Sequence, residues 1–220
     1  MNSSIRPENI EKIINSVERY NPENLPALEK YLALQCSGQE HDLMANLAIL
    51  KMYQFNPQLV NHQIVCSILI KALTAIPNSD FNLCLYLLNE QIISEASVAK
   101  VVSLHKILEE ARYEEFWSKI GSDSDYKELL SDVVSFEKEI RTMIAKNIAI
   151  TYQVVSLKHL EGYLNIKGQE LENFVKEQGW TKQEENVTIP LNKDNEAKQI
   201  VITENIKFEQ LTKILCHSSA

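Results

Sequence analysis

The chain has 220 residues, of which 45% are hydrophobic and only five are glycine. This composition suits one or two helical globular domains that need no disulfide or metal to hold them together. The formal net charge of -8 argues against broad polyanion binding, because phosphate backbones are recognised by clustered Lys and Arg. The N-terminus has no apolar core of a signal peptide, and the longest apolar run, near residues 64–76, is interrupted by Lys71 and too short to span a bilayer. We therefore expect a soluble, intracellular protein.

The N-terminal part of the chain predicts a series of amphipathic helices. We assign Val17 and Tyr20 to the buried stripe of the first helix. Asn-Pro pairs at Asn21 and Asn56 carry the signals of a helix start, and their repetition at a spacing typical of stacked helical pairs favours a repeat architecture. The expected helices cover residues 7–20, 21–37, 42–53, 58–76, 80–88, 94–108, 116–120 and 126–133, with a loop over residues 121–125.

Residues 135–191 organise the rest of the chain. The pattern is a long amphipathic helix from Phe136, a short β-branched run at residues 151–155, a helix starting at Ser156, a break at residues 165–168, a helix ending at Gly179, and a β-ribbon at residues 187–190. This order predicts a winged helix with a small β wing. Trp180 is expected to fill the core between wing and helix, since a large aromatic beside a glycine more often packs than binds a ligand.

The tail after Pro190 is polar over residues 191–198, which predicts a mobile segment. Residues 200–202 suit either a last wing strand or an extended connector. A final short helix then has one narrow apolar face, and because such a helix is marginal alone in water, it needs a surface to dock on. Edge pairing of the wing ribbon is a second docking mode. The protein-docking candidates are Val187 and Ile189 in the wing and Phe208, Leu211, Ile214 and Leu215 in the last helix.

No sequence motif for nucleotide binding, metal binding or covalent catalysis is present, so no cofactor is expected. The four cysteines form no Cys-x-x-Cys pair, and we interpret Cys36, Cys66 and Cys84 as buried thiols because apolar helical residues surround them. We interpret His159 and the glutamates at residues 109–110 and 114–115 as solvated helix faces, because no neighbouring Gly or His suggests a pocket at the glutamates. The chain is not expected to be an enzyme.

A winged helix often places its second helix in the major groove of DNA, so nucleic-acid binding is the first alternative to protein docking. Here that helix, residues 169–177, has three Glu and one Lys. Residues 154–190 contain six Glu, four Lys and no Arg or Asp, a net charge of -2. Because Lys and Arg contacts to phosphate supply most of the affinity of such complexes, we expect this module to dock on proteins and not to bind DNA directly.

Several short motifs, in this order and at these spacings, resemble one known family. They are residues 19–25 (RYNPENL), residues 53–57 (YQFNP), Asp80-Phe81 with Leu83-Cys84, Phe116-Trp117, residues 150–153 (ITYQ) and Gly179-Trp180. From about Val17 to Phe208, the chain resembles the subunit k family of eukaryotic translation initiation factor 3. The first and third of these motifs are the most specific.

The resemblance implies a PCI-type module of mainly α fold. A HEAT-like helical repeat domain over residues 1–133 would precede a linker helix and winged-helix domain over residues 134–203, and a C-terminal helix and tail over residues 204–220. Modules of this type join side by side through their winged helices, and the C-terminal helices of such subunits gather in a bundle. The last helix of this chain would suit that bundle.

The resemblance also implies a non-catalytic scaffold subunit of a cytoplasmic complex that acts in the initiation of protein synthesis. The implied partners are other subunits of the factor, notably subunit l, and the small ribosomal subunit through the complex, with no membrane involved. Two alternatives stay open from the residues alone. One is a winged-helix nucleic-acid-binding protein, and the other is a PCI subunit of another complex, the proteasome lid or the signalosome.

Overall fold

The structure, a computed structural model, describes residues 6–38, 40–196 and 211–212. Its α-helices are α1 (Glu8–Ile14), α2 (Leu25–Ser37), α3 (Leu43–Phe55), α4 (His62–Leu73), α5 (Asp80–Leu85), α6 (Glu90–Ile93), α7 (Ala96–Glu109), α8 (Tyr113–Ser122), α9 (Ser124–Ser131), α10 (Phe136–Thr151), α11 (Leu157–Leu164) and α12 (Gln169–Glu177). Three 3-10 turns, η1 (Val17–Tyr20), η2 (Pro22–Asn24) and η3 (Pro57–Leu59), and three strands, β1 (Val154–Ser156), β2 (Thr181–Gln183) and β3 (Asn186–Thr188), complete it. The predicted mainly α fold with a small β wing is confirmed. No helix within the described ranges is long and apolar enough to cross a membrane.

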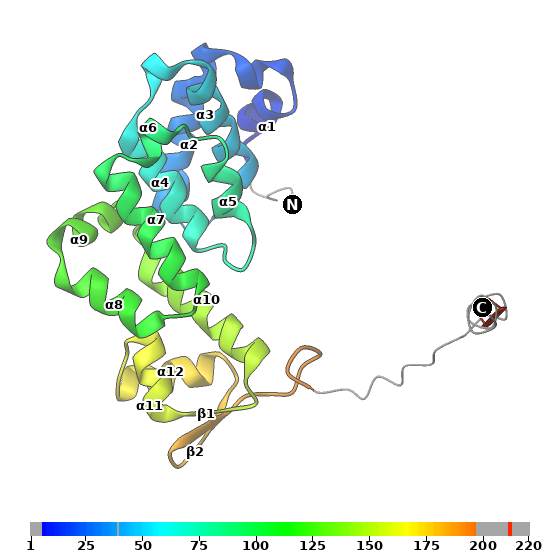
Figure 1. Cartoon of the computed structure of the whole chain (residues 1–220), viewed down its shortest axis with the longest axis vertical. Helices are drawn as coiled ribbons and strands as arrows, with labels where there is room; N and C mark the ends of the chain where they lie inside the picture. The colour runs from blue at the N-terminus through cyan, green and yellow to red at the C-terminus, as the bar shows by residue number, and fades with distance from the viewer. Residues whose placement is uncertain (1–5, 39, 197–210, 213–220) are drawn as a thin grey trace, which may run out of the picture.

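The helices from α1 to α9 form an elongated stack, and the strands lie at the opposite end of the molecule from α1 (Figure 1). Helix α2 packs on α3, α4 on α5 and α7, and α8 on α7 and α9. Helix α10 contacts both α4 in the stack and α11 beside the strands. Buried apolar side chains from all these layers form one core, in which the Phe116 ring of α8 meets the Phe136 ring of α10 at 6.4 Å between centroids. Helix α10 therefore leads the chain from the stack to the β wing, and α8 of the stack also packs on α11.

The first helix is shorter than predicted. Helix α1 ends at Ile14, and the backbone becomes extended at Ser16, whose hydroxyl accepts a hydrogen bond from the N–H of Glu18 (3.2 Å) and starts η1. Serine side chains compete with helical hydrogen bonding in this way. Val17 and Tyr20 are consequently 80% and 45% exposed, so their assignment to a buried stripe is wrong.

Both Asn-Pro pairs begin 3-10 turns and not α-helices. After Asn21, turn η2 runs directly into α2, as the predicted start signal requires. After Asn56, turn η3 is followed by a break, and α4 begins later than the predicted residue 58 because Asn61 supplies the cap, accepting a hydrogen bond from the N–H of Gln63 (3.0 Å). Proline suits both turns because it fixes φ and has no N–H to satisfy.

The predicted loop over residues 121–125 is almost entirely helical. Helix α8 continues to Ser122 and α9 begins at Ser124, so only Asp123 separates them. The carboxylate of Asp123 accepts a hydrogen bond from the N–H of Asp125 (2.9 Å) and caps the new helix. A single N-cap residue separates the two helices where the composition predicted a longer loop.

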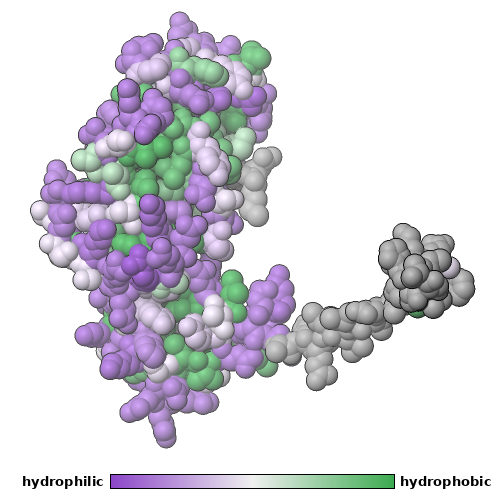
Figure 2. Space-filling model, in the orientation of Figure 1, coloured by the Kyte–Doolittle hydropathy of each residue, from purple (hydrophilic) through white to green (hydrophobic). Residues whose placement is uncertain are grey.

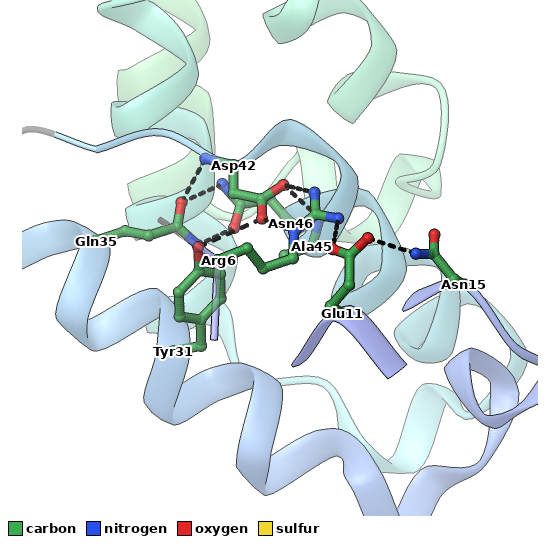
Figure 3. Close-up of polar contacts among 8 residues, drawn as sticks. All are labelled: Arg6, Glu11, Asn15, Tyr31, Gln35, Asp42, Ala45 and Asn46. Carbon is green, nitrogen blue, oxygen red and sulfur yellow. Dashed lines mark hydrogen bonds and ion pairs between the residues drawn. The ribbon is translucent and has the colours of Figure 1, made fainter. Parts of the chain in front are cut away.

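A buried polar network holds the N-terminal segment to the stack (Figure 3). The Arg6 guanidinium donates to both carboxylate oxygens of Asp42 (2.6 and 2.8 Å) and to Glu11 (2.6 Å). The Arg6 and Asp42 side chains are only 4% and 2% exposed. Asp42 also caps α3, because its carboxylate accepts a hydrogen bond from the N–H of Ala45 (3.2 Å). Burial acts to raise the pKa of Asp42, but its hydrogen bonds and the charge of Arg6 outweigh burial and lower it.

Three of the four cysteines lie in the core of the stack as free thiols, which confirms their interpretation from the sequence. Burial raises the pKa of the Cys84 thiol to about 12 and also raises the pKa values of Cys36 and Cys66. A thiol that stays protonated is a poor nucleophile and metal ligand, so these side chains serve as packing groups. Cys216 lies outside the described residues.

Candidate protein-docking surface

Residues 154–189 form a unit of two helices and three strands, which we call the wing module. Its sheet is antiparallel with strand order β1-β3-β2, so β3 lies between the other two strands. The helix boundaries agree with the sequence prediction, but β1 covers only the end of the predicted run at residues 151–155, and the ribbon predicted at residues 187–190 consists of β2 and β3 and ends at Thr188. Ser156 caps α11, Asn165 ends it in the left-handed conformation, and Gly179, with φ of 70°, follows α12. Trp180 is 7% exposed and packs in the core of the module, as predicted.

The two docking candidates in the wing, Val187 and Ile189, point into the module. They are 0% and 2% exposed, and Val187 has a partner strand on both sides, since it pairs with Val155 of β1 and Lys182 of β2. Their side chains are buried and the backbone of β3 is paired on both sides, so neither residue is free to contact a partner, and the prediction of these two residues as docking residues is wrong. The apolar alternation that suggested them marks the core-facing side of a strand. The open edges of the sheet belong to β1 and β2.

Of the four docking candidates in the last helix, only Leu211 lies within the described residues, where it is 42% exposed. Phe208, Ile214 and Leu215 lie outside them, as does the wing strand or connector considered at residues 200–202. A role of this apolar face in docking stays a prediction.

Exposed apolar side chains gather instead at the junction of α10 and the edge strand β1. Ile150, Tyr152 and Val154 are 45%, 40% and 53% exposed, and Leu191, which follows β3, is 65% exposed. We call these four residues the β1-edge patch. Sequence reasoning missed them because it assigned residues 151–155 to a strand without asking which strand would lie at the edge. The mixture of aromatic and β-branched residues there was the available signal.

An asparagine side chain places Leu191 beside the rest of this patch. The Asn195 amide donates hydrogen bonds to the carbonyl oxygens of Ala149 (3.1 Å), Tyr152 (3.3 Å) and Pro190 (3.1 Å). Asn192 also donates to Ala149 (2.9 Å). These bonds satisfy carbonyls at the C-terminal end of α10, which have no partner within the helix. The described part of the tail, to residue 196, is therefore an anchored turn and not the mobile segment that its polarity predicted.

Asn195→Ala is expected to release this turn without unfolding the protein. The change removes four hydrogen bonds, because the Asn195 side chain also accepts one from the N–H of Asn192 (2.8 Å), but the partners lie near the surface and can bond to water instead. We expect faster amide hydrogen exchange at residues 191–196, with a loss of global stability below about 1 kcal/mol. Hydrogen-exchange mass spectrometry measures the first effect and urea unfolding the second. Asn173→Ala, on exposed α12, is the control, and unchanged exchange in Asn195→Ala would contradict the anchoring role.

Two polar contacts connect the stack to the wing module. Trp117 of α8 donates its indole N–H to the carbonyl of Tyr163 in α11 (2.8 Å), and Arg141 of α10 donates to the carbonyl of Leu164 (3.0 Å). The Arg141 guanidinium also lies 5.2 Å from the centre of the Trp117 ring, a cation–π contact. Because Trp117 is buried, these contacts fix the orientation of the module relative to the stack.

The charges on α12 do not favour binding to the phosphate backbone of a nucleic acid. Glu170 and Glu177 are exposed, and Lys182, one of the few cations of the module, is already paired with Glu172 (2.7 Å). This hydrogen bond lowers the pKa of Glu172 and keeps it charged. The surface at the tip of the β2–β3 hairpin is strongly hydrophilic (Figure 2). The module therefore presents acidic and polar groups here, and the exposed apolar side chains lie at its border, in the β1-edge patch.

The described part of the chain holds no group of three or more His, Cys, Asp or Glu that could bind a metal ion. His159 is exposed, its Nδ1 lies 2.9 Å from the Ser156 hydroxyl oxygen, and its ring stacks on Tyr163. The glutamates at residues 109–110 and 114–115 are exposed, as predicted for a solvated face. Within the residues that the structure describes, the geometry around the module thus offers surfaces for binding.

A family model and several curated proteins similar to this chain point to the same family. Residues 59–200 match the model of the CSN8/PSMD8/EIF3K family. A protein of Sclerotinia sclerotiorum named eukaryotic translation initiation factor 3 subunit K is 40% identical over 227 residues, which cover 96% of this chain and 93% of the relative. Proteins of the same name from Botryotinia fuckeliana and Yarrowia lipolytica are 40% and 35% identical, covering 96% of this chain and 93% and 94% of the relatives.

Proposed function

Because the chain belongs to the eukaryotic translation initiation factor 3 subunit K family, we propose that it is a non-catalytic scaffold subunit of that initiation factor. The single observation that carries this proposal is similarity over nearly the whole chain to proteins that carry this name. In this role the chain works in the cytoplasm and acts by docking. It binds other subunits, notably subunit l, and reaches the small ribosomal subunit through the complex.

We further propose that residues 1–133 act as a HEAT-like helical repeat domain and residues 134–203 as the linker helix and winged helix of a PCI-type module. The order β1-α11-α12-β2-β3 and the central position of β3 support a winged helix. The C-terminal segment, residues 204–220, supplies the second docking element through its apolar face.

The β1-edge patch is the proposed contact of the wing module with a neighbouring subunit. Val154 lies on an edge strand whose only partner among the described strands is β3, so the other side of β1 can pair with a strand of another chain. Tyr152 precedes β1 and Leu191 follows β3, and both add exposed apolar surface at that end of the sheet. Main-chain pairing supplies affinity in such contacts, and side chains along the edge supply specificity.

Val154→Asp is expected to weaken binding of the purified chain to recombinant subunit l by at least about tenfold, or about 1.4 kcal/mol. A carboxylate at the centre of an apolar contact would lose its hydration without gaining a partner. Fold stability should change little, because Val154 is already 53% exposed. Isothermal titration calorimetry measures the affinity.

Val134→Asp is the matched control, since Val134 is 79% exposed but lies in the connection before α10. Equal affinity of Val154→Asp and the wild type would exclude the β1-edge patch as the contact. The double change Phe208→Asp/Leu211→Asp tests the C-terminal helix in the same assay. If the unmodified chain fails to bind subunit l and any other subunit of the factor, the scaffold function itself is overturned.

A further inference from the structure

A second surface suited to binding lies at the end of the stack farthest from the wing module, between η1 and α3 (Figure 1). It is a groove of about 260 Å³. We call it the η1–α3 groove, and its lining residues are Ile14, Arg19, Tyr20, Met44, Leu47, Ala48, Lys51 and Leu87. Six of these eight residues carry apolar or aromatic side chains, so the floor of the groove is suited to bury apolar groups.

The break at Ser16 creates this groove. Because η1 turns away from the line of α1, Tyr20 stays 45% exposed and its ring meets the ring of Phe55 edge-on, with 6.3 Å between centroids. Phe55 is 61% exposed and Met44 is 48% exposed. The sequence predicted that a helix continuing through Ser16 would bury Tyr20. The chain instead leaves two aromatic rings and a methionine in solvent, a combination enriched in protein interfaces.

The rim of the groove is positively charged. The Arg19 guanidinium lies 4.8 Å from the centre of the Tyr20 ring, and the Lys51 amine lies 5.0 Å from the centre of the Phe55 ring. Within the part of the chain that the structure describes, neither cation forms an ion pair with a carboxylate, and the hydrogen-bond partner of Lys51 is the neutral side chain of Gln54 (2.8 Å). Two cations over aromatic rings thus border an apolar groove in a chain whose net charge is -8.

We propose that the η1–α3 groove docks an acidic amphipathic segment of a partner protein. The apolar face of the segment fills the groove, and its carboxylates pair with Arg19 and Lys51, which the aromatic rings already hold in place. The chain's own tail is a poor occupant, because residues 197–220 contain three Lys and two Glu and so lack the complementary charge. This surface is separate from the β1-edge patch and does not depend on the function proposed above.

The test uses the full chain and two short fluorescein-labelled helical peptides. Both peptides carry the same Leu and Phe face, and their polar positions are all Glu in one peptide and all Lys in the other. Fluorescence polarisation should show the Glu peptide binding at least about tenfold more tightly, a difference of about 1.4 kcal/mol. Arg19→Glu/Lys51→Glu should reverse this preference, and Phe55→Ala should weaken binding of the Glu peptide about fivefold. Arg19 and Phe55 are exposed and Lys51 is partly exposed, and circular dichroism melting checks that the variants fold.

Lys158→Glu/Lys167→Glu is the matched control, because it changes two exposed cations of the wing module. If this control lowers affinity for the Glu peptide as much as the groove variant does, long-range charge explains the binding and the proposal fails. Equal affinities for the two peptides would also overturn it. A peptide of residues 204–215 that binds more tightly than the Glu peptide would make the chain's own tail the occupant. If light scattering shows that the chain self-associates and Phe55→Ala abolishes this self-association, the occupant of the groove would be a second copy of the chain. Either result contradicts the proposal.

Discussion

Asp42→Ala is expected to lower the free energy of unfolding by about 3–5 kcal/mol, the usual cost of removing one partner of a buried ion pair. The change leaves the guanidinium of Arg6, whose side chain is 4% exposed, without its two-point acceptor. It also removes the N-cap of α3. A loss of this size is a large fraction of the stability of an ordinary domain. Urea unfolding followed by circular dichroism measures it.

Lys12→Ala is the control, because Lys12 and Glu8 form an exposed ion pair on α1 whose loss should cost less than about 1 kcal/mol. Asp42 also sets a pH dependence. Its folded pKa lies below the unfolded value near 3.9, so its stabilisation is present above that value and is lost as the pH falls through the folded pKa. Asp42→Asn should show a weaker loss of stability in acid. An Asp42→Ala variant as stable as the wild type would contradict the role of the network.

Glu139→Ala is expected to lower the free energy of unfolding by about 3 kcal/mol, for a related reason. Lys71 of α4 is completely buried, and its amine lies 3.1 Å from both carboxylate oxygens of Glu139 in α10. Its other acceptor is the carbonyl of Gly38 at 3.5 Å. Removing Glu139 therefore leaves a buried ammonium with one long hydrogen bond. Chemical unfolding monitored by tryptophan fluorescence measures the loss.

Lys71→Met should cost less than Glu139→Ala, because methionine fills nearly the same volume and Glu139, at 14% exposed, keeps contact with water and with the Ser135 hydroxyl. The double change Lys71→Met/Glu139→Leu should recover most of the stability, since apolar replacements of buried ion pairs are often neutral. The idea is refuted if the two single changes cost the same and the double change costs their sum.

Local signals in the sequence predicted the wing module well. Ser156 begins a helix and Asn165 and Gly179 end helices, because caps and left-handed residues act within one turn of the backbone. The same reasoning failed at Ser16, where the serine side chain bonds forward to Glu18 although the apolar spacing continued. Periodicity could not show that break, since Val17 and Tyr20 keep the helical spacing.

The residues of the proposed docking surface could not be predicted, because their exposure depends on contacts between distant parts of the chain. Whether Val187 faces a partner or the core is decided by the position of β3 between β1 and β2. The exposure of Leu191 depends on the Asn195 hydrogen bonds to α10. The Arg6–Asp42 pair joins two loops that no local pattern relates. A charge count over residues 154–190 did predict the acidic character of α12, because net charge does not depend on the fold.

The contacts of Trp117 and Arg141 with α11 have a consequence for an assembled complex. They hold the wing module in one orientation relative to α10 and the stack, so the molecule is a rigid connector. Partners that bind at the proposed β1-edge patch and η1–α3 groove would then be held at one separation and one relative rotation. The information that such a chain contributes is geometric. This fixed geometry tolerates extensive change of the exposed residues as long as the Trp117 indole and the Arg141 guanidinium keep the wing module from rotating.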